Sequence, residues 1–332
     1  FCFFTFLIGI IIILLVSNGC KKDDSNGNNS NNSNNNPTIQ VSTLSTNDIS
    51  NVTLTSAICG GNITSDGGAK VTVRGVCWSK NQTPTTSDSV AKDGTDTGTF
   101  TSNIIGLTNN TTYYVRAYAT NSAGTGYGNI ISFTTNVIDI DGNVYHTVKI
   151  GTQTWMVENL KTTKLNDGTA IPLVTNNSSW ASLGSPGFCW YNNDETTNKN
   201  IYGALYNWYA TATINLCPSG WHVPTVVEWL TLINFLGGEL GAAQKLKESG
   251  NSHWSGGSAN NVSGFYALPG GYRAASVSFA GYFYEINTNG YWWASDNNGL
   301  YADDFMMHDT ESSVGHSNGL KSCGASVRCI KN

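Results

Sequence analysis

The stretch between residues 252 and 310 combines aromatic rings with carboxylates and amides, the side chains that could bind a ligand. Sugar sites pair aromatic platforms, which contact the CH faces of the sugar ring, with polar side chains that bond to its hydroxyls. The alternative is that most of these rings belong to the core. Trp292 and Trp293 are adjacent, so in a strand they point to opposite faces and at most one is exposed on a given surface. The predicted ligand-binding residues are Trp254, Tyr272, Arg273, Trp292, Trp293, Asp296 and Asn297.

Two groups of acidic side chains have part of the spacing that calcium requires. Residues 139–143 carry Asp, Asp and Asn at alternate positions, but the Glu that completes such a loop is absent, so this segment predicts a hairpin turn. Asp303 and Asp304 could bind calcium together with Asp296, or they could lie in a solvated loop. The five His show no metal-ligand spacing. We therefore expect no metal and no cofactor, with calcium as the one ion left open.

Six of the eight cysteines are expected to form disulfides. Cys2 lies in an apolar run and Cys20 is a candidate for lipidation, which leaves even numbers in each remaining segment. Even numbers in a secreted chain indicate disulfides, and the sequence has no Cys-x-x-Cys pair or Cys/His cluster that would indicate metal. Two fall in residues 37–135, where they could bridge two strands or stay as buried thiols, and the other four allow three pairings. The six are Cys59, Cys77, Cys189, Cys217, Cys323 and Cys329.

The N-terminal residues indicate where the protein is sent. Residues 1–16 are almost continuously apolar, too short for a membrane span but the right length for the core of a signal peptide whose basic start is missing. Small residues before Cys20 resemble a bacterial lipobox, in which the Cys thiol is lipidated. A buried helix with an accidental Cys is the alternative. We predict a signal peptide over residues 1–19 and a lipid-anchored Cys20.

Residues 20–36 are expected to be a disordered tether. The Lys-Lys-Asp-Asp sequence at 21–24 resembles the surface-export signal of Bacteroidetes lipoproteins, or it forms an ordinary solvated cluster. The Asn and Ser that follow have nothing apolar to bury and cannot offset the entropy cost of ordering. We predict an outer-membrane protein, lipid-anchored and facing the cell surface. The 17 Lys and Arg against 22 Asp and Glu, a net charge of −5, argue against nucleic acid as a partner.

Residues 37–135 read as short strands separated by turn residues, which predicts a β-sandwich. Residues 56–63 and 71–79, joined by a Ser-Asp-Gly-Gly turn, are predicted to pair with each other. Residues 113–119 alternate between the two faces of a strand. Leu107, six residues before Tyr113, resembles the tyrosine corner of a fibronectin type III sandwich. That resemblance implies a spacer or a module for protein contacts, and we predict no site in it.

Residues 136–332 contain nine of the ten Trp and one well-specified helix. Thr225 and Glu228 form the capping box typical of a helix start. The apolar residues that follow fall on one stripe at helical spacing, which predicts a helix packed on the core, and a Gly-Gly pair at 237–238 ends it. A second short helix is expected around residues 245–247. The stripe consists of Val226, Trp229, Leu230, Ile233 and Leu236.

Seven motifs in this segment stand in the order found in one family. Together they closely resemble the FISUMP domain (Fibrobacter succinogenes major paralogous domain) of bacterial surface proteins, over essentially all of residues 136–332. The start of the capped helix also looks like the formylglycine-generating enzyme group, and these families are thought to share a C-type-lectin-like fold. The resemblance therefore implies an irregular α+β scaffold with long loops. The motifs are Trp155-Met156-x-Glu158-Asn159-Leu160, Cys189-Trp190-Tyr191-Asn192-Asn193-Asp194, Tyr202-Gly203-Ala204-Leu205-Tyr206-Asn207-Trp208, Cys217-Pro218-x-Gly220-Trp221-His222-Val223-Pro224-Thr225-x-x-Glu228-Trp229, Leu268-Pro269-Gly270-Gly271-Tyr272-Arg273, Gly290-Tyr291-Trp292-Trp293 and Ser326-Val327-Arg328-Cys329.

The resemblance also bears on how four cysteines pair. This sequence departs from the family at Cys323, where an aromatic residue is expected, and the extra thiol could pair with Cys189. Cys217 is then left for Cys329. Such a bridge would tie the capped helix to the last strand, as lectin-like folds often do.

The FISUMP resemblance implies no defined activity, so the predicted function rests on architecture. We predict an all-β fibronectin type III-like sandwich followed by an α+β C-type-lectin-like domain, a non-catalytic binding or adhesion module for an extracellular glycan or protein. A structural envelope protein without a ligand is the first alternative. The second is an oxidase-like relative of the formylglycine-generating group, in which Cys323 and Cys329 would be free thiols that bind copper.

Overall fold

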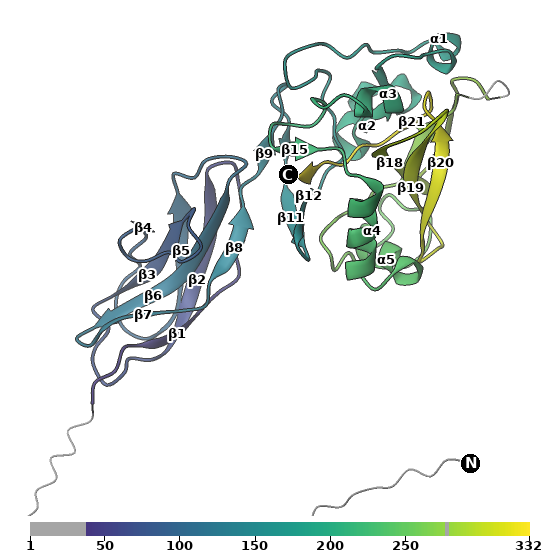
Figure 1. Ribbon diagram of the computed structural model, residues 1–332. Helices are drawn as coiled ribbons and strands as arrows, with labels where there is room; N and C mark the ends of the chain where they lie inside the picture. Colours follow the sequence, from purple (N-terminus) through teal and green to yellow (C-terminus); the bar gives the residue numbers. More distant parts are fainter. Residues whose placement is uncertain (1–37, 276–278) are drawn as a thin grey trace, which may run out of the picture. The chain divides into compact units, whose positions relative to one another are not determined.

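The computed structural model describes residues 38–275 and 279–332 (Figure 1). The predicted signal peptide at 1–19, Cys20 and the tether at 20–36 lie outside the described residues. Among the helices that are described, none has the length and apolar character that crossing a membrane would require. The strands fall into separate sheets before and after residue 136, and each group has its own buried cluster of side chains.

The first group of strands forms a fibronectin type III-like sandwich of two antiparallel sheets (Figure 1). Its strands are β1 (Thr43–Thr46), β2 (Ser56–Ser65), β3 (Val73–Ser79), β4 (Ser89–Val90), β5 (Gly98–Ile105), β6 (Thr112–Asn121), β7 (Gly124–Tyr127) and β8 (Ile131–Thr134). One sheet has the order β1-β2-β5. The other has the order β4-β3-β6-β7, and β8 pairs with β6 as well.

The core of the sandwich confirms the predicted alternation and corrects the predicted strand pairing. Val115, Ala117 and Ala119 are buried in the core together with Tyr113, whose hydroxyl accepts the N–H of Thr108 at 3.1 Å and so forms the tyrosine corner. Strands β2 and β3 both form, but β2 pairs with β1 and β5 while β3 pairs with β4 and β6. The prediction that they pair with each other is wrong because the segment between them crosses from one sheet to the other.

The two cysteines of the sandwich are free, so the predicted Cys59–Cys77 bridge is not formed. Cys59 belongs to the core between the sheets. Cys77 lies between the core residues Val76 and Trp78, and alternation along β3 directs it to the opposite face of its sheet. Burial raises the pKa of both thiols to about 11, which makes them unreactive.

The second group of strands and all the described helices follow residue 136. The elements are β9 (Val137–Ile138), β10 (Val144–Tyr145), β11 (Thr147–Ile150), β12 (Gln153–Met156), α1 (Asn177–Ala181), β13 (Phe188–Cys189), the 3-10 helix η1 (Tyr191–Asn193), α2 (Glu195–Tyr202), β14 (Leu205–Asn207), α3 (Trp208–Thr211), β15 (Trp221–His222), α4 (Val226–Phe235), α5 (Glu239–Leu246), β16 (Gly270–Arg273), β17 (Phe283–Ile286), β18 (Asn289–Asn298), β19 (Tyr301–His308), β20 (Val314–Leu320), β21 (Gly324–Ala325) and β22 (Ile330–Lys331).

Two sheets organise this part of the chain. In the four-stranded sheet β11-β12-β22-β15, β12 pairs with β22, which is the last strand of the chain. The eight-stranded sheet runs β13-β14-β21-β16-β18-β19-β20, with β17 paired to β16. Strand β20 is an edge of that sheet, so one side of it is free of backbone partners among the described residues.

Helix α4 begins at the predicted capping box and ends at the predicted glycines. The Thr225 hydroxyl accepts the Glu228 N–H at 3.2 Å, and the Glu228 carboxylate accepts the Thr225 N–H at 2.8 Å. Gly237 and Gly238 both adopt positive φ, which a side chain would disfavour, and the helix stops before them. The predicted second helix forms as α5. The buried face of α4, with Trp229 at its centre, packs into one of the two large buried clusters of this part of the chain.

The two faces of β18–β20 have different surroundings, as alternation of Trp292 and Trp293 predicts. Trp292 is fully buried in the cluster that contains Trp229 and Phe305, on the face that α4 and α5 cover (Figure 1). Trp293 belongs to a different cluster, on the face away from those helices. The candidate site lies on that second face.

A buried polar network joins the segments that carry the FISUMP-like motifs. The Asn159 side-chain oxygen accepts Trp292 Nε1 at 2.8 Å and Arg328 Nη2 at 2.6 Å. Arg328 also donates to the carbonyl of Phe265. Burial lowers the pKa of this guanidinium to about 9, because no solvent stabilises its charge. The motif residues Asn159, Trp292 and Arg328 are therefore structural.

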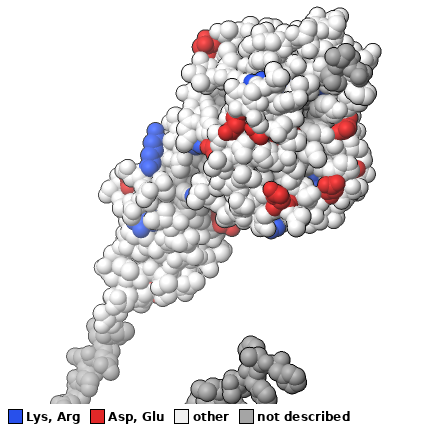
Figure 2. All heavy atoms as spheres, turned by 45° about the vertical axis from the view of Figure 1, so that its right-hand side comes forward, with Lys and Arg blue, Asp and Glu red and all other residues white. Residues whose placement is uncertain are grey.

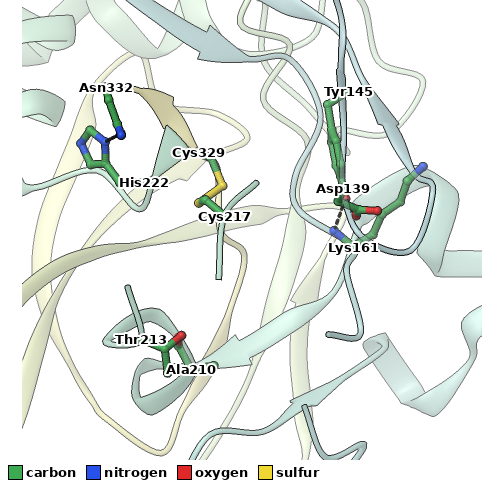
Figure 3. Close-up of a disulfide and its surroundings, with 9 residues drawn as sticks. All are labelled: Asp139, Tyr145, Lys161, Ala210, Thr213, Cys217, His222, Cys329 and Asn332. Atoms are coloured by element: carbon green, nitrogen blue, oxygen red, sulfur yellow. Dashed lines mark hydrogen bonds between the residues drawn. A yellow bond between two sulfur atoms is a disulfide. The ribbon is translucent and has the colours of Figure 1, made fainter. Parts of the chain in front are cut away.

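The predicted Cys217–Cys329 disulfide is confirmed (Figure 3). The bond joins the loop before β15 to the residue before β22, two strands that pair, and its Cα atoms are 6.1 Å apart. Beyond it, His222 Nδ1 contacts the Asn332 side-chain oxygen at 2.6 Å. Because Cys329 is in a disulfide, the pair of free thiols expected for the oxidase-like alternative is not formed.

The predicted bridge between Cys189 and Cys323 is not formed, and both thiols are free. Cys189 is fully buried in a small cluster with Trp180 and Leu205, and burial raises its pKa to about 12. Cys323 packs against a different cluster, in the loop between β20 and β21. The two sulfurs therefore have separate surroundings.

Candidate functional site

A cavity of about 190 Å³ opens where β16 and β21 meet the face of β18–β20 that is opposite α4 and α5. Two of the predicted ligand-binding residues, Tyr272 and Trp293, line it. The other lining residues supply a ring, a carboxyl, hydroxyl and amide groups, a thiol and three positions with little or no side chain. They are Tyr291, Asp304, Ser317, Asn318, Gly319, Cys323, Gly324 and Ala325.

The register of three strands places the central groups of the cavity in one row. Trp293 on β18 pairs with Asp304 on β19, and Asp304 pairs with Ser317 on β20. Directly paired residues of antiparallel strands share a face. Gly319 keeps the space beside this row open, since a Cβ there would lie 2.9 Å from the Trp293 ring and 3.0 Å from Asp304 Oδ2.

Asp304 is the buried charge of the cavity. Asp304 is 6% exposed, and its Oδ1 accepts a hydrogen bond from the Ser317 hydroxyl at 2.6 Å. Among the described residues, no side chain donates to Oδ2, and the backbone N–H of Gly319 lies near the carboxyl and favours its ionised form. Burial raises the pKa of the Asp304 carboxyl, because the ionised form loses the water that would stabilise it. The cavity therefore presents an acceptor that gains free energy when a donor or a cation binds it.

A second carboxylate, on the exposed residue Glu285, is hydrogen-bonded to one of the lining rings. The Tyr291 hydroxyl donates to Glu285 Oε2 at 2.6 Å, and the Asn289 amide donates to the same oxygen at 2.7 Å. Tyr272 packs edge-on against Tyr291, with ring centroids 5.2 Å apart. Burial and the Glu285 bond hold the pKa of the Tyr291 hydroxyl well above its usual value. Tyr291 thus remains a neutral donor at physiological pH.

The Cys323 thiol lines the cavity, so its rate of reaction can report whether the cavity is occupied. It is the one free thiol among the described residues that is not fully buried. Burial of most of its surface raises the pKa of the thiol, so it reacts slowly as the native protein stands. Occupation of the cavity should slow that reaction further.

Three predicted ligand-binding residues are structural. Trp292 is core, and Trp254 is 2% exposed and donates its Nε1 to the Ala267 carbonyl at 3.0 Å. Arg273 is fully buried and donates to the backbone oxygens of Val174 and Thr175 and to Gly281. Its guanidinium therefore holds loops together and does not reach a ligand.

The remaining two predicted residues have other partners. Asp296 Oδ2 accepts the N–H of Val226, the first residue of α4, at 2.6 Å, so it stabilises the helix start. The Asn297 side-chain oxygen accepts Lys321 Nζ at 2.6 Å. The calcium group that the sequence left open is not assembled, because Asp303 contacts His316 on the face opposite Asp304 and Asp296 accepts the N–H of Val226. The expectation of a solvated loop is wrong, since Asp303 and Asp304 both lie in strand β19. No cluster suited to a metal is found among the described His, Cys, Asp and Glu.

The segment 139–143 forms the predicted hairpin turn, between β9 and β10. Asp139 Oδ1 accepts the N–H groups of Asp141 and Asn143 at 3.0 and 2.9 Å. Its other oxygen accepts the Tyr145 hydroxyl at 2.6 Å (Figure 3). These donors occupy the carboxylate, which is therefore a turn residue.

Ser317 was not predicted as a member of the site, although residues 315–319 read Gly-His-Ser-Asn-Gly. The order Gly-x-Ser-x-Gly is typical of hydrolases in which Ser stands on a sharp strand-to-helix turn. Here Ser317 lies within strand β20, and His316 points to the opposite face, where it contacts Asp303. The geometry lacks the hydrogen-bonded Ser-His pair of such enzymes. Gly319 had no signal in the sequence beyond its position, and Cys323 was predicted only as a disulfide or copper-binding residue.

The sequence profile of the Fibrobacter succinogenes major domain (Fib_succ_major) matches residues 148–331, more than half of the chain. The chain belongs to this family. The match contains every residue of the cavity, and it confirms the FISUMP resemblance over that range. No curated protein matches the Fib_succ_major chain at a significant level.

Three solved structures similar to parts of this Fib_succ_major protein each cover about a third of it or less. The sensor domain of the anti-sigma factor RsgI4 from Pseudobacteroides cellulosolvens has 18% identity and a TM-score of 0.23, covering 29% of this chain and 96% of its own. A human KIAA0970 fibronectin type III domain has 12% identity and a TM-score of 0.21, covering 28% and 72%. The chicken CNTN1 FN1–FN3 domains have 14% identity and a TM-score of 0.21, covering 34% and 39%.

Proposed function

We propose that the chain is a non-catalytic binding module of the bacterial cell surface, and that the cavity beside Asp304 is its ligand site. The observation that carries this proposal is the buried Asp304 carboxyl, which faces an open cavity with one oxygen free of side-chain donors. A buried carboxylate without a cation costs free energy. Proteins retain buried groups that lower their stability mainly at functional sites.

The ligand we propose is a group of an extracellular glycan or protein. Aromatic side chains beside a carboxyl, a hydroxyl and an amide suit the CH faces and polar groups of either class. Nucleic acid is disfavoured, since Lys and Arg are few and scattered on the face that Figure 2 shows.

The fold we propose for residues 136–332 is C-type-lectin-like. Two features support it: β11 and β12, near the start of this segment, lie in one sheet with its last strand β22, and a disulfide ties the segment before α4 to the residue before β22. Anchoring through a lipidated Cys20 and the tether at 20–36 completes the proposed arrangement. Palmitate labelling of cells should mark the wild type and not Cys20→Ala, and protease added to intact cells should remove the protein. Absence of label, or resistance of the protein on intact cells, would contradict the anchor or the exposure.

A structural envelope protein is the second candidate function. Full burial of Trp254, Trp292 and Arg273 favours it, because these side chains hold the fold together. Partial exposure of Tyr272 and Tyr291 at the cavity favours binding instead.

Binding should be tested on glycan and peptide arrays, with calcium present and with calcium chelated. Gly319→Ala fills the cavity, since its Cβ meets Trp293 and Asp304. Gly315→Ala is the matched control, because it lies on the same strand and its Cβ meets only the flexible Met306 side chain. We expect the wild type and Gly315→Ala to bind the same array members and Gly319→Ala to lose them. Equal binding by Gly319→Ala would place any site elsewhere, and no binding by the wild type would favour the structural protein.

A further inference from the structure

We infer that the group bound beside Asp304 is a cation, the ammonium or guanidinium end of a ligand. This inference rests on the proposed function of the cavity and names the chemistry it selects. Asp304 Oδ2 has no side-chain donor, and a neutral group could supply one, but only a cation also balances the charge.

The first step concerns charge balance. None of the described lining residues is Lys or Arg. Two basic residues lie within two positions of a lining residue, and both have other partners: Arg273 donates to backbone oxygens, and Lys321 donates to Asn297. His316 is close to Asp304, but it contacts Asp303 at 2.9 Å on the other face of the sheet. The Asp304 carboxyl therefore lacks a cationic hydrogen-bond partner among the described residues.

The second step concerns the groups around that carboxyl. Tyr272, Tyr291 and Trp293 line the cavity, and aromatic rings of this kind attract cations to their faces. Glu285, which is exposed, accepts a hydrogen bond from the Tyr291 hydroxyl and adds a second negative charge near the lining. Rings and carboxylates together favour a positive group over a neutral or negative one.

The third step concerns hydrogen bonds and size. Asp304 Oδ2 can accept a donor, and Ser317, which donates its proton to Asp304 Oδ1, retains a lone pair that can accept another. An ammonium or guanidinium group supplies several donors and needs no acceptor lone pair. At about 190 Å³ the cavity is smaller than sites for drug-sized ligands, which suits the end of a side chain or one small amine.

The test uses calorimetric titration of the full chain with small probes at constant ionic strength. n-Butylammonium and n-butylguanidinium are the cationic probes, and n-butanol is the neutral control of matched shape. We expect the cations to bind at least about tenfold more tightly than n-butanol. Asp304→Asn keeps the shape and the Ser317 bond, and it should weaken cation binding by about 10- to 100-fold. Gly319→Ala should also weaken it, and Gly315→Ala should leave it unchanged.

A second readout keeps the test independent of how well the variants fold. Alkylation of Cys323 in the wild-type chain can be followed by mass spectrometry of the peptide at residues 322–328. Saturating cation should slow that alkylation several-fold, and n-butanol should not. Unchanged alkylation at saturating cation would overturn the inference even if some heat of binding were measured.

Two further comparisons show whether the bound cation comes from a protein side chain or from an amino sugar. The amide of Nα-acetyl-lysine, whose ε-amine is free, represents a protein side chain. Glucosamine represents an amino sugar, and N-acetylglucosamine is its neutral control. Binding of either amine with loss in Asp304→Asn supports the inference and identifies the source. If N-acetylglucosamine binds in a Gly319-dependent manner while the amines do not, the proposed site stands and the cation inference is overturned. If no probe binds, the cation inference is overturned, and the array comparison decides the proposed function separately.

Discussion

Loss of the Cys217–Cys329 disulfide should destabilise the C-terminal part of the chain strongly. The bond joins residues separated by 112 positions. In the chain-entropy description, closing a loop of that length restricts the unfolded chain by about 4.8 kcal/mol at 25 °C. Residual structure in the unfolded chain reduces the effect, so we expect Cys217→Ala with Cys329→Ala to lose about 3 to 5 kcal/mol of the free energy of unfolding.

Urea unfolding followed by Trp fluorescence is the appropriate assay, because nine of the ten Trp lie after residue 136. Cys323→Ala is the control for the loss of a thiol without loss of a bond, and it should cost much less. Reduction of the wild-type chain should reproduce the midpoint of the double variant. A difference below about 1 kcal/mol between wild type and double variant would refute the argument that loop closure dominates.

The other predictions concern single side chains and use the same unfolding assay. Thr225→Ala removes the capping box of α4 and should cost about 1 kcal/mol, whereas Thr231→Ala on the exposed side of that helix should cost less than about 0.5 kcal/mol; equal effects would contradict the capping role. Lys247→Met removes an ammonium that donates to three backbone carbonyls at 2.8 to 3.0 Å. It should lower the free energy of unfolding by about 3 kcal/mol. A loss under about 1 kcal/mol would contradict this role and show that the carbonyls find other donors. Asp304→Asn should be more stable than the wild type at neutral pH. Burial raises the folded-state pKa of Asp304 above the ordinary 3.8. The wild type therefore loses stability relative to the Asn variant as the pH rises from about 3.8 through the raised folded-state pKa. A difference between the two that is independent of pH would contradict the burial of an ionised carboxyl.

Local signals in the sequence predict local structure well. The Thr225–Glu228 box and the glycines at 237–238 act within one or two helical turns, so the bounds of α4 follow from them. Alternation along residues 113–119 likewise identifies the core face of β6. The pairing of β2 and β3 could not be read in the same way, because a Gly-rich turn between two apolar runs suits both a hairpin and a crossing between sheets.

The site was harder to predict because large rings stabilise cores as effectively as they bind ligands. Trp254 and Trp292 are ordinary core residues, and nothing in their spacing distinguishes them from Tyr272, which lines the cavity. Asp304 and Ser317 become neighbours only through the register of β19 against β20. That register depends on pairings across the whole sheet, which composition and periodicity do not specify.

The central claim is that the cavity beside Asp304 binds the cationic end of a ligand. A crystal structure of the full chain soaked with n-butylammonium tests it most directly. The account predicts density for the probe between Tyr272, Tyr291 and Trp293, with its nitrogen about 3 Å from the Asp304 carboxyl. Density for the probe only at other places on the surface, or a probe whose nitrogen points away from Asp304, would contradict it.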